Sequence, residues 1–211
     1  MSDIGEDIKE VLDELGPAVS IYKYATATSY EEHVDLIYEV NQVYPWTSHF
    51  IMKALFVYDT QAEPGDLLTL TEEPVERFLI VSSTPERFEG ASLSSESVIY
   101  KCNALAEIRR RTERREGYDM EIDWPINYSG EYCFFTGMMK SQFTEDGDQT
   151  ISVLDRNEMY ISDHIDVRIE DRCVIKQSMD DVSGEAYEVR QIERNRLPNI
   201  KICKVRQETR E

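Results

Sequence analysis

Residues able to do chemistry are few in this chain and lie far apart. The three histidines, His33, His49 and His164, fall in unrelated segments, and no GxSxG turn marks a nucleophilic serine. Neither an HExxH pair nor a glycine-rich phosphate loop occurs, so no metal or nucleotide motif is present. We therefore expect no catalytic residue, no cofactor and no metal. An enzyme would need one of these histidines to meet a carboxylate in a pocket after folding.

Acidic and thiol side chains also lack the spacing of a ligand set. Glu145, Asp146 and Asp148 resemble the opening of a calcium loop, but the glycine falls too early and no glutamate closes the loop. A hairpin turn is the better interpretation. The four cysteines are widely separated, each in an apolar run, which predicts buried, reduced thiols and not a zinc site. They are Cys102, Cys133, Cys173 and Cys203.

The net charge of the chain argues against binding to the outside of a nucleic acid. Forty-two acidic residues against twenty-three basic ones give a formal net charge of −19. Such a chain is not expected to bind the outside of a nucleic acid by neutralising phosphates. The composition is typical of a soluble, self-repelling surface, and the alternative is an acidic wall past which DNA moves without sticking. The N-terminus lacks an apolar signal core, and no window reaches the roughly 20 apolar residues that span a bilayer.

Only the first segment has the pattern of a helix. Ser2 is a suitable N-cap, and Gly16-Pro17 is a stop signal. Between them an apolar stripe recurs at helical spacing, and it must be buried within its own module or against a neighbouring subunit. The stripe consists of Ile4, Ile8, Val11, Leu12 and Leu15. Ile4, Ile8 and Leu12 are therefore candidate subunit contacts.

From residue 19 onward the apolar period is close to two, which indicates strands separated by turns. The two halves end alike: Gly65–Ala104 and His164–Val205 each contain an Asp-led apolar strand, a strand opened by an aromatic, and a closing strand with one cysteine. The sequence thus predicts a mainly β protein with two tandem small β-barrel-like modules and a short N-terminal α-helix. We expect the first module, with the helix, to cover residues 1–104 and the second 126–211.

Residues 105–125 have a different composition and are expected to form an arginine-rich linker. Glu107, Glu113 and Glu116 lie among the arginines, so a solvated linker with internal Glu–Arg pairs is one interpretation. Docking onto an acidic face of another subunit is the second, since arginine forks suit carboxylates. Contact with DNA phosphate is a third, weakened by those acids. The candidate subunit contacts are Arg109, Arg110, Arg111, Arg114 and Arg115. Tyr44 and Trp46, bulky and predicted in a loop, are further candidates.

The order of these elements resembles structural proteins of tailed-bacteriophage necks. The opening DIKEVLDELGPAVSIYK resembles their short helix running into a first strand. FVYDTQAEPGDLLTL, ERFLIVSSTPERFEG and SVIYKCNA are similar to a head-closure type β-barrel, and YISDHIDVRIEDRCVI with EAYEVRQIERNRLPNIKICKV is similar to a second.

The resemblance implies a non-enzymatic virion protein. It would form a cyclic homo-oligomer between the capsid portal or adaptor ring and the tail proteins, with DNA passing through its channel and no membrane involved. A tail terminator and a capsid accessory protein are the nearest alternatives. From another class, a soluble acidic inhibitor that mimics DNA would bind a basic enzyme with strong salt dependence.

Overall fold

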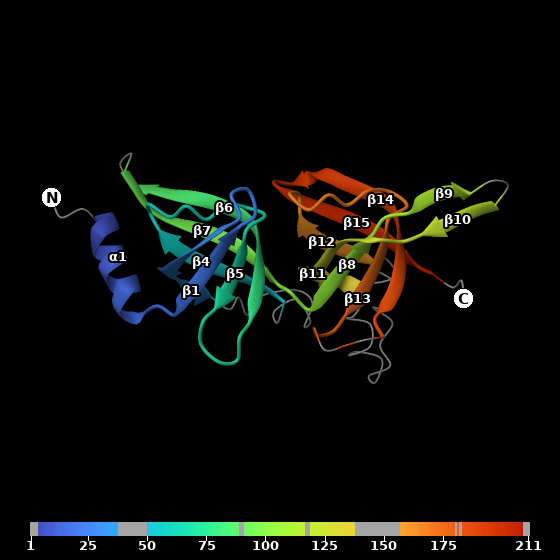
Figure 1. Cartoon of the computed structure of the whole chain (residues 1–211). Helices are drawn as coiled ribbons and strands as arrows, with labels where there is room; N and C mark the ends of the chain where they lie inside the picture. Colours follow the sequence, from blue (N-terminus) through green and yellow to red (C-terminus); the bar gives the residue numbers. More distant parts are fainter. Residues whose placement is uncertain are drawn as a thin grey trace, which may run out of the picture. The chain divides into compact units, whose positions relative to one another are not determined.

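The computed structural model describes residues 4–37, 50–88, 91–116, 119–137, 157–179, 181 and 183–208. Ser2, Tyr44, Trp46, His49 and the turn expected at 145–148 lie outside these residues. The chain divides into two compact units, and each is treated separately (Figure 1). The N-terminal unit comprises Met1–Cys102 with Leu197–Ile200, and the C-terminal unit comprises Asn103–Arg196 with Lys201–Glu211. The predicted mainly β fold with one short helix is confirmed for the described residues.

The N-terminal unit consists of one helix and an antiparallel sheet in the order β2-β1-β5-β6-β7-β4-β3. Its elements are α1 (Ile4–Leu15), β1 (Ala18–Lys23), β2 (Thr28–His33), β3 (Asp35–Ile37), β4 (Ile51–Val57), β5 (Leu67–Leu70), β6 (Arg77–Phe88) and β7 (Ala91–Lys101). The two edge strands β2 and β3 are separated in the sequence by Val34 alone, which is fully buried. The sheet is therefore rolled toward closure and barrel-like.

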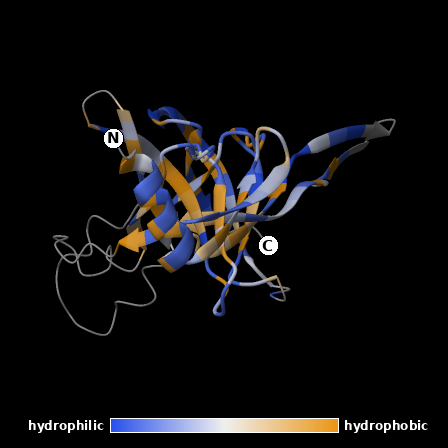
Figure 2. Cartoon of the chain, turned by 90° about the vertical axis from the view of Figure 1, so that its left-hand side faces the viewer, coloured by the Kyte–Doolittle hydropathy of each residue, from blue (hydrophilic) through white to orange (hydrophobic). Residues whose placement is uncertain are grey.

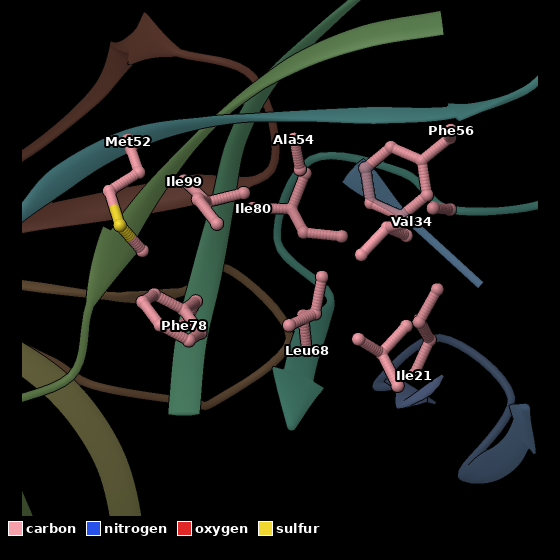
Figure 3. Packing of buried hydrophobic residues seen from close by; sticks show 11 residues of the cluster. Ile21, Val34, Met52, Ala54, Phe56, Leu68, Phe78, Ile80 and Ile99 are labelled. Carbon is pink, nitrogen blue, oxygen red and sulfur yellow. The ribbon is translucent and has the colours of Figure 1, made fainter. Parts of the chain in front are cut away.

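One hydrophobic core fills this rolled sheet. Alternate residues of β4, Met52, Ala54 and Phe56, point inward, as the period-two pattern predicts. They meet side chains from strands spread across the whole sheet, which converge on a single cluster (Figure 3). The other fully buried members are Val19, Ile21, Val34, Leu68, Phe78, Ile80 and Ile99. A flat sheet would not bring these strands around one core.

Helix α1 lies close against this sheet because a glycine faces it. A Cβ at Gly5 would lie 3.1 Å from the Tyr58 ring and 3.2 Å from the Ser92 carbonyl oxygen. Leu12, about two turns further along the same face of the helix, is buried. The helix ends at Leu15, and the Gly16 amide donates to the Leu12 carbonyl at 2.8 Å, as the stop signal predicts.

The C-terminal unit is a closed six-stranded barrel in the order β11-β12-β15-β14-β13-β8, with a separate two-stranded ribbon of β9 and β10. The strands are β8 (Ala104–Arg109), β9 (Thr112–Glu116), β10 (Asp119–Asp123), β11 (Ile126–Phe135), β12 (Glu158–Ser162), β13 (Arg172–Lys176), β14 (Glu185–Leu197) and β15 (Ile200–Gln207). Closure gives every barrel strand a neighbour on both sides, so the barrel exposes no edge. Ile108, Phe135, Ile161, Val189 and Ile202 are buried in its core.

The expected linker at residues 105–125 is corrected by the structure. Strand β8 closes the barrel between β11 and β13, and Leu105 and Ile108 are buried there. β9 and β10 then pair as a hairpin ribbon, with Thr112 opposite Asp123 (Figure 1). The charged residues concealed this strand because the partners that bury it are distant in sequence. No linker separates the two units; the boundary falls between Cys102 and Asn103.

The similar endings of the two halves correspond to three consecutive neighbouring strands in each unit, β5-β6-β7 and β13-β14-β15. One part of the pattern was wrong, since residues 164–169 form no strand. Ile165 and Val167 are buried, but the buried Lys201 ammonium binds the Asp163 and Ile165 carbonyl oxygens at 2.7 and 2.6 Å. These side chain–backbone bonds hold a loop where apolar alternation predicted a strand.

Candidate functional site

Among the described residues, one histidine meets a carboxylate at the wall of a cavity. No set of three His, Cys, Asp or Glu side chains among them is arranged to hold a metal ion. His33 lies 3.5 Å from the Asp13 carboxylate, and His164 stands on an exposed loop. His33 and Asp13 both line the cavity of the N-terminal unit described below, and His164 belongs to the other unit.

The cysteines are free thiols, as predicted. Cys133, Cys173 and Cys203 are fully buried. Burial raises the pKa of Cys203 to about 12 and that of Cys102 also to about 12. Because the thiolate is the nucleophile, these thiols are poor nucleophiles in the folded protein.

A cavity of about 560 Å³ in the N-terminal unit lies between α1, β1, β2 and the segment after β4. Thr60 donates to one Glu32 carboxylate oxygen at 2.8 Å. The other Glu32 oxygen and the Tyr30 hydroxyl are buried with no hydrogen-bond partner among the described atoms. Burial raises the pKa of Glu32, so this carboxyl is protonated more readily than a surface glutamate. Lys9 of α1 pairs with Asp59 at 2.8 Å, which ties the helix to the segment after β4.

A second cavity, of about 410 Å³, lies in the C-terminal unit between β11, β13 and the segment leading into β14. Phe135, Ile175 and Tyr187 form part of its wall. Its polar side chains are already bonded to one another: Tyr187 donates to Glu185 at 2.6 Å, and Asp181 accepts from the Ser183 hydroxyl at 2.8 Å. These bonds hold the segment before β14 and the first residues of that strand in place.

The apolar stripe of α1 is divided between the sheet and the surface. Leu12 is 6% exposed and Ile8 is half-buried, so two of the three predicted helix contacts pack within their own unit. Ile4, Val11 and Leu15 are 47%, 54% and 77% exposed. We call these three residues the apolar strip. Figure 2 shows the orange apolar positions of the helix beside its blue polar ones. The strip is a hydrophobic surface that the unit itself does not cover.

The predicted arginine cluster is used largely within its own unit. Arg109 donates to the buried Glu107 at 2.6 Å, and Arg111 pairs with Glu113 at 2.8 Å. Although burial acts to raise it, hydrogen bonds from Arg109 and Lys176 hold the pKa of Glu107 below its usual value.

Arg110 is the most fully bonded member of the cluster. Its Nε and Nη2 atoms bind both oxygens of the buried Asp171 at 3.0 and 2.9 Å, and Nη1 binds Asp166 at 3.0 Å. The pKa of Asp166 is lowered to about 2, chiefly by a hydrogen bond from Arg168 and to a smaller extent by one from Arg110. Arg114 is exposed on β9 and has a bonding partner, and Arg115 lies on the same strand. Arg109, Arg110 and Arg111 are thus held in ion pairs within their own unit.

The sequence pattern missed a different group of arginines. Arg194 and Arg196 on β14 are exposed, and no carboxylate of the described residues lies within ion-pairing distance of either. We call them the strand arginines. By contrast, Arg190 on the same strand pairs with Glu188 at 2.8 Å. The signal was present in the sequence as an Arg-x-Arg spacing within a strand, which places two side chains on one face.

Comparison with known proteins supplies no identity for this arrangement. No protein-family model matches the chain, and neither curated proteins nor solved structures match it. The helix of the described residues is too short and too polar to cross a bilayer. Function is therefore inferred from the fold and its exposed surfaces.

Proposed function

We propose that this chain is a non-enzymatic structural protein of a tailed-bacteriophage neck. In this proposal, copies form a ring that joins the capsid portal to the tail and surrounds the DNA channel. The proposal is supported by the order of elements, a short helix followed by two barrel-like modules, which resembles head-closure proteins.

The observation that carries the proposal is the apolar strip on α1. Ile4, Val11 and Leu15 remain 47–77% exposed although the helix is firmly docked through Gly5 and Leu12. Burying a whole aliphatic side chain contributes about 1.5–3 kcal/mol, so covering the exposed parts of these three would contribute roughly 3 kcal/mol per contact. In a cyclic assembly the contact recurs between every neighbouring pair, so a modest surface stabilises the whole ring.

The negative net charge of the chain supports a channel wall to which DNA does not bind. The net charge of −19 opposes the counterion-releasing phosphate contacts that would immobilise the genome. The internal pairing of Arg109, Arg110 and Arg111 removes the densest basic run of the chain from that role. A wall of this kind guides DNA by repulsion.

Electron microscopy and light scattering of the purified full-length chain test this proposal. We expect ring-shaped particles whose population grows with concentration, and the protein as a stoichiometric component of virions, located between portal and tail. A position at the far end of the tail tube or on the capsid shell would favour a tail terminator or a capsid accessory protein. A strictly monomeric chain that is absent from particles would refute the proposal.

Variants of α1 separate assembly from folding. Val11→Glu places a charge in the exposed strip and is expected to abolish rings while leaving the circular dichroism spectrum and melting temperature unchanged. The matched control is Glu6→Gln, an exposed position on the same helix that faces away from the strip. Rings that persist in the Val11→Glu variant would show that the strip is not a subunit contact.

A further inference from the structure

The surface beside the apolar strip is strongly acidic. Helix α1 carries five acidic residues, Glu6, Asp7, Glu10, Asp13 and Glu14, and one basic residue, Lys9, which is paired with Asp59. At the angular period of a helix, Asp7, Glu10 and Glu14 lie along one side of the strip. All three are exposed, and no cation of the described residues forms an ion pair with them. We call them the acidic ridge.

The acidic ridge restricts what can cover the strip. A two-fold contact between the helices of two copies would bring two such ridges together, and like charges in juxtaposition oppose association. The surface that covers the strip must therefore bury its apolar side chains and carry positively charged side chains beside them. Most of the arginines in the predicted cluster are unsuitable, since Arg109, Arg110 and Arg111 already bind carboxylates of their own unit.

The strand arginines have the complementary charge and spacing. Two residues along a β-strand advance about 6.6 Å, which is the separation expected between the Cα atoms of Arg194 and Arg196. Residues four apart on a helix advance about 6 Å, which is the separation expected along the axis between Glu10 and Glu14. A strand laid along the helix would thus place two guanidinium groups opposite two carboxylates.

We propose that α1 of one copy docks on the exposed face of β14 at Arg194 and Arg196 of a neighbouring copy. This contact rests on the ring proposed above and names the surfaces that build it. It joins the N-terminal unit of one copy to the C-terminal unit of the next, so every copy both presents a helix and receives one. A contact between two different surfaces is the kind that closes into a ring when repeated by rotation.

The two parts of the contact have different roles. Ion pairs near the surface contribute little net affinity, so burial of the apolar strip against Ile192, which shares this face of β14, and against the aliphatic stems of the strand arginines supplies most of the stabilisation. The arginine–carboxylate pairs select the partner surface and the register of helix on strand. Reversal of these charges therefore acts by repulsion as well as by loss of attraction.

Charge reversal with mutual rescue tests the docking. The helix variant carries Glu10→Arg and Glu14→Arg, and the strand variant carries Arg194→Glu and Arg196→Glu. Each alone is expected to weaken self-association on the order of tenfold or more, because both docking surfaces then have the same sign. A mixture of the two is expected to assemble again, with the variants alternating around the ring. The control pair, Glu72→Arg and Arg87→Glu, reverses exposed charges elsewhere and should assemble like the unmodified chain.

The outcomes separate this contact from the proposed function. Rings that form normally from either variant alone would overturn the docking and leave the ring itself standing. A wild-type chain that never self-associates would overturn both. Strand-variant rings of normal stability that lose retention on DNA would show that the strand arginines face nucleic acid, and this also overturns the docking.

A second measurement does not depend on charge. Leu15→Cys in one preparation and Ile192→Cys in another introduce thiols at the end of the strip and, two residues before Arg194, on the same face of β14 as the strand arginines. Mixing the two should give a covalent dimer under oxidising conditions, and each variant alone should give far less. Equal cross-linking within a single preparation would contradict a contact between unlike surfaces.

Discussion

Removal of the Arg110 guanidinium is expected to destabilise the C-terminal unit far more than removal of its neighbour Arg111. Asp171 is 3% exposed, and Arg110 binds both of its oxygens. Breaking a buried pair by removing one partner costs roughly 3–5 kcal/mol. Asp171 keeps one bond from the Arg168 backbone amide at 2.9 Å, and Arg110 is 23% exposed, so solvent offsets part of the loss. We therefore expect Arg110→Met to lower the free energy of unfolding by about 2–4 kcal/mol.

Arg111→Met is the matched control because it makes the same change at the next residue. Arg111 and its partner Glu113 are 42% and 52% exposed. Surface pairs of this kind contribute about 0–1 kcal/mol, so little loss of stability is expected. Methionine keeps much of the aliphatic stem of arginine, so both variants test the charged group and not the packing of the stem.

Urea unfolding followed by tryptophan fluorescence measures this difference. The chain has two tryptophans, so a Trp46→Phe background leaves Trp124 as a reporter of the C-terminal unit. Trp124 is suited to this because the Arg172 guanidinium lies 5.6 Å from its ring centre. A loss below about 1 kcal/mol in Arg110→Met, or equal losses in both variants, would refute the reasoning that burial separates these arginines.

Three further predictions concern pH, thiol reactivity and the first core. The pKa of Asp166 falls from 3.8 to about 2 on folding, so the stability that it provides is complete above pH ~4 and is lost as the pH falls toward 2. Asp166→Asn should therefore reduce the slope of unfolding free energy against pH in that window, measured by urea titrations. Cys133, Cys173 and Cys203 should react with a thiol reagent at pH 8 only after denaturation, and rapid labelling of the native chain would contradict their burial. Phe78→Ala, which opens the core of the N-terminal unit, should cost about 3–5 kcal/mol in thermal or urea unfolding, whereas Phe88→Ala at a 55% exposed position should have little effect.

Much of the fold could be predicted because strand alternation is a local property. The segments containing β1, β4 and β15 have apolar residues at a period near two, β6 begins with a short continuous apolar run, and each is a strand in the structure. Strand β8 was missed because three of its six residues, Glu107 and two alanines, carry no strong β signal. Its burial follows from pairing with β13, more than 60 residues further along the chain, as the register Val174–Glu107 illustrates.

The candidate surfaces were also predictable only as far as local sequence patterns reach. Helix periodicity correctly identified the stripe on α1, but it could not divide Leu12 from Val11, since only the docked sheet covers one and not the other. The arginine run was conspicuous by composition, yet Arg110 is bound by Asp166 and Asp171, which lie 56 and 61 residues away. Arg194 and Arg196 do not stand out by composition, yet no carboxylate of the described residues forms an ion pair with either.

The sequence by itself determined the mainly β character, the N-terminal helix, the free thiols and the acidic surface of this protein. These follow from residue type and from periods of two and 3.6, which act over a few neighbouring residues. Only the tertiary structure decided which strands close the C-terminal barrel, which arginines are neutralised and which hydrophobic residues stay exposed. Those outcomes depend on contacts between residues far apart in the chain, where burial and the removal of water decide the strength of each charge and each apolar group.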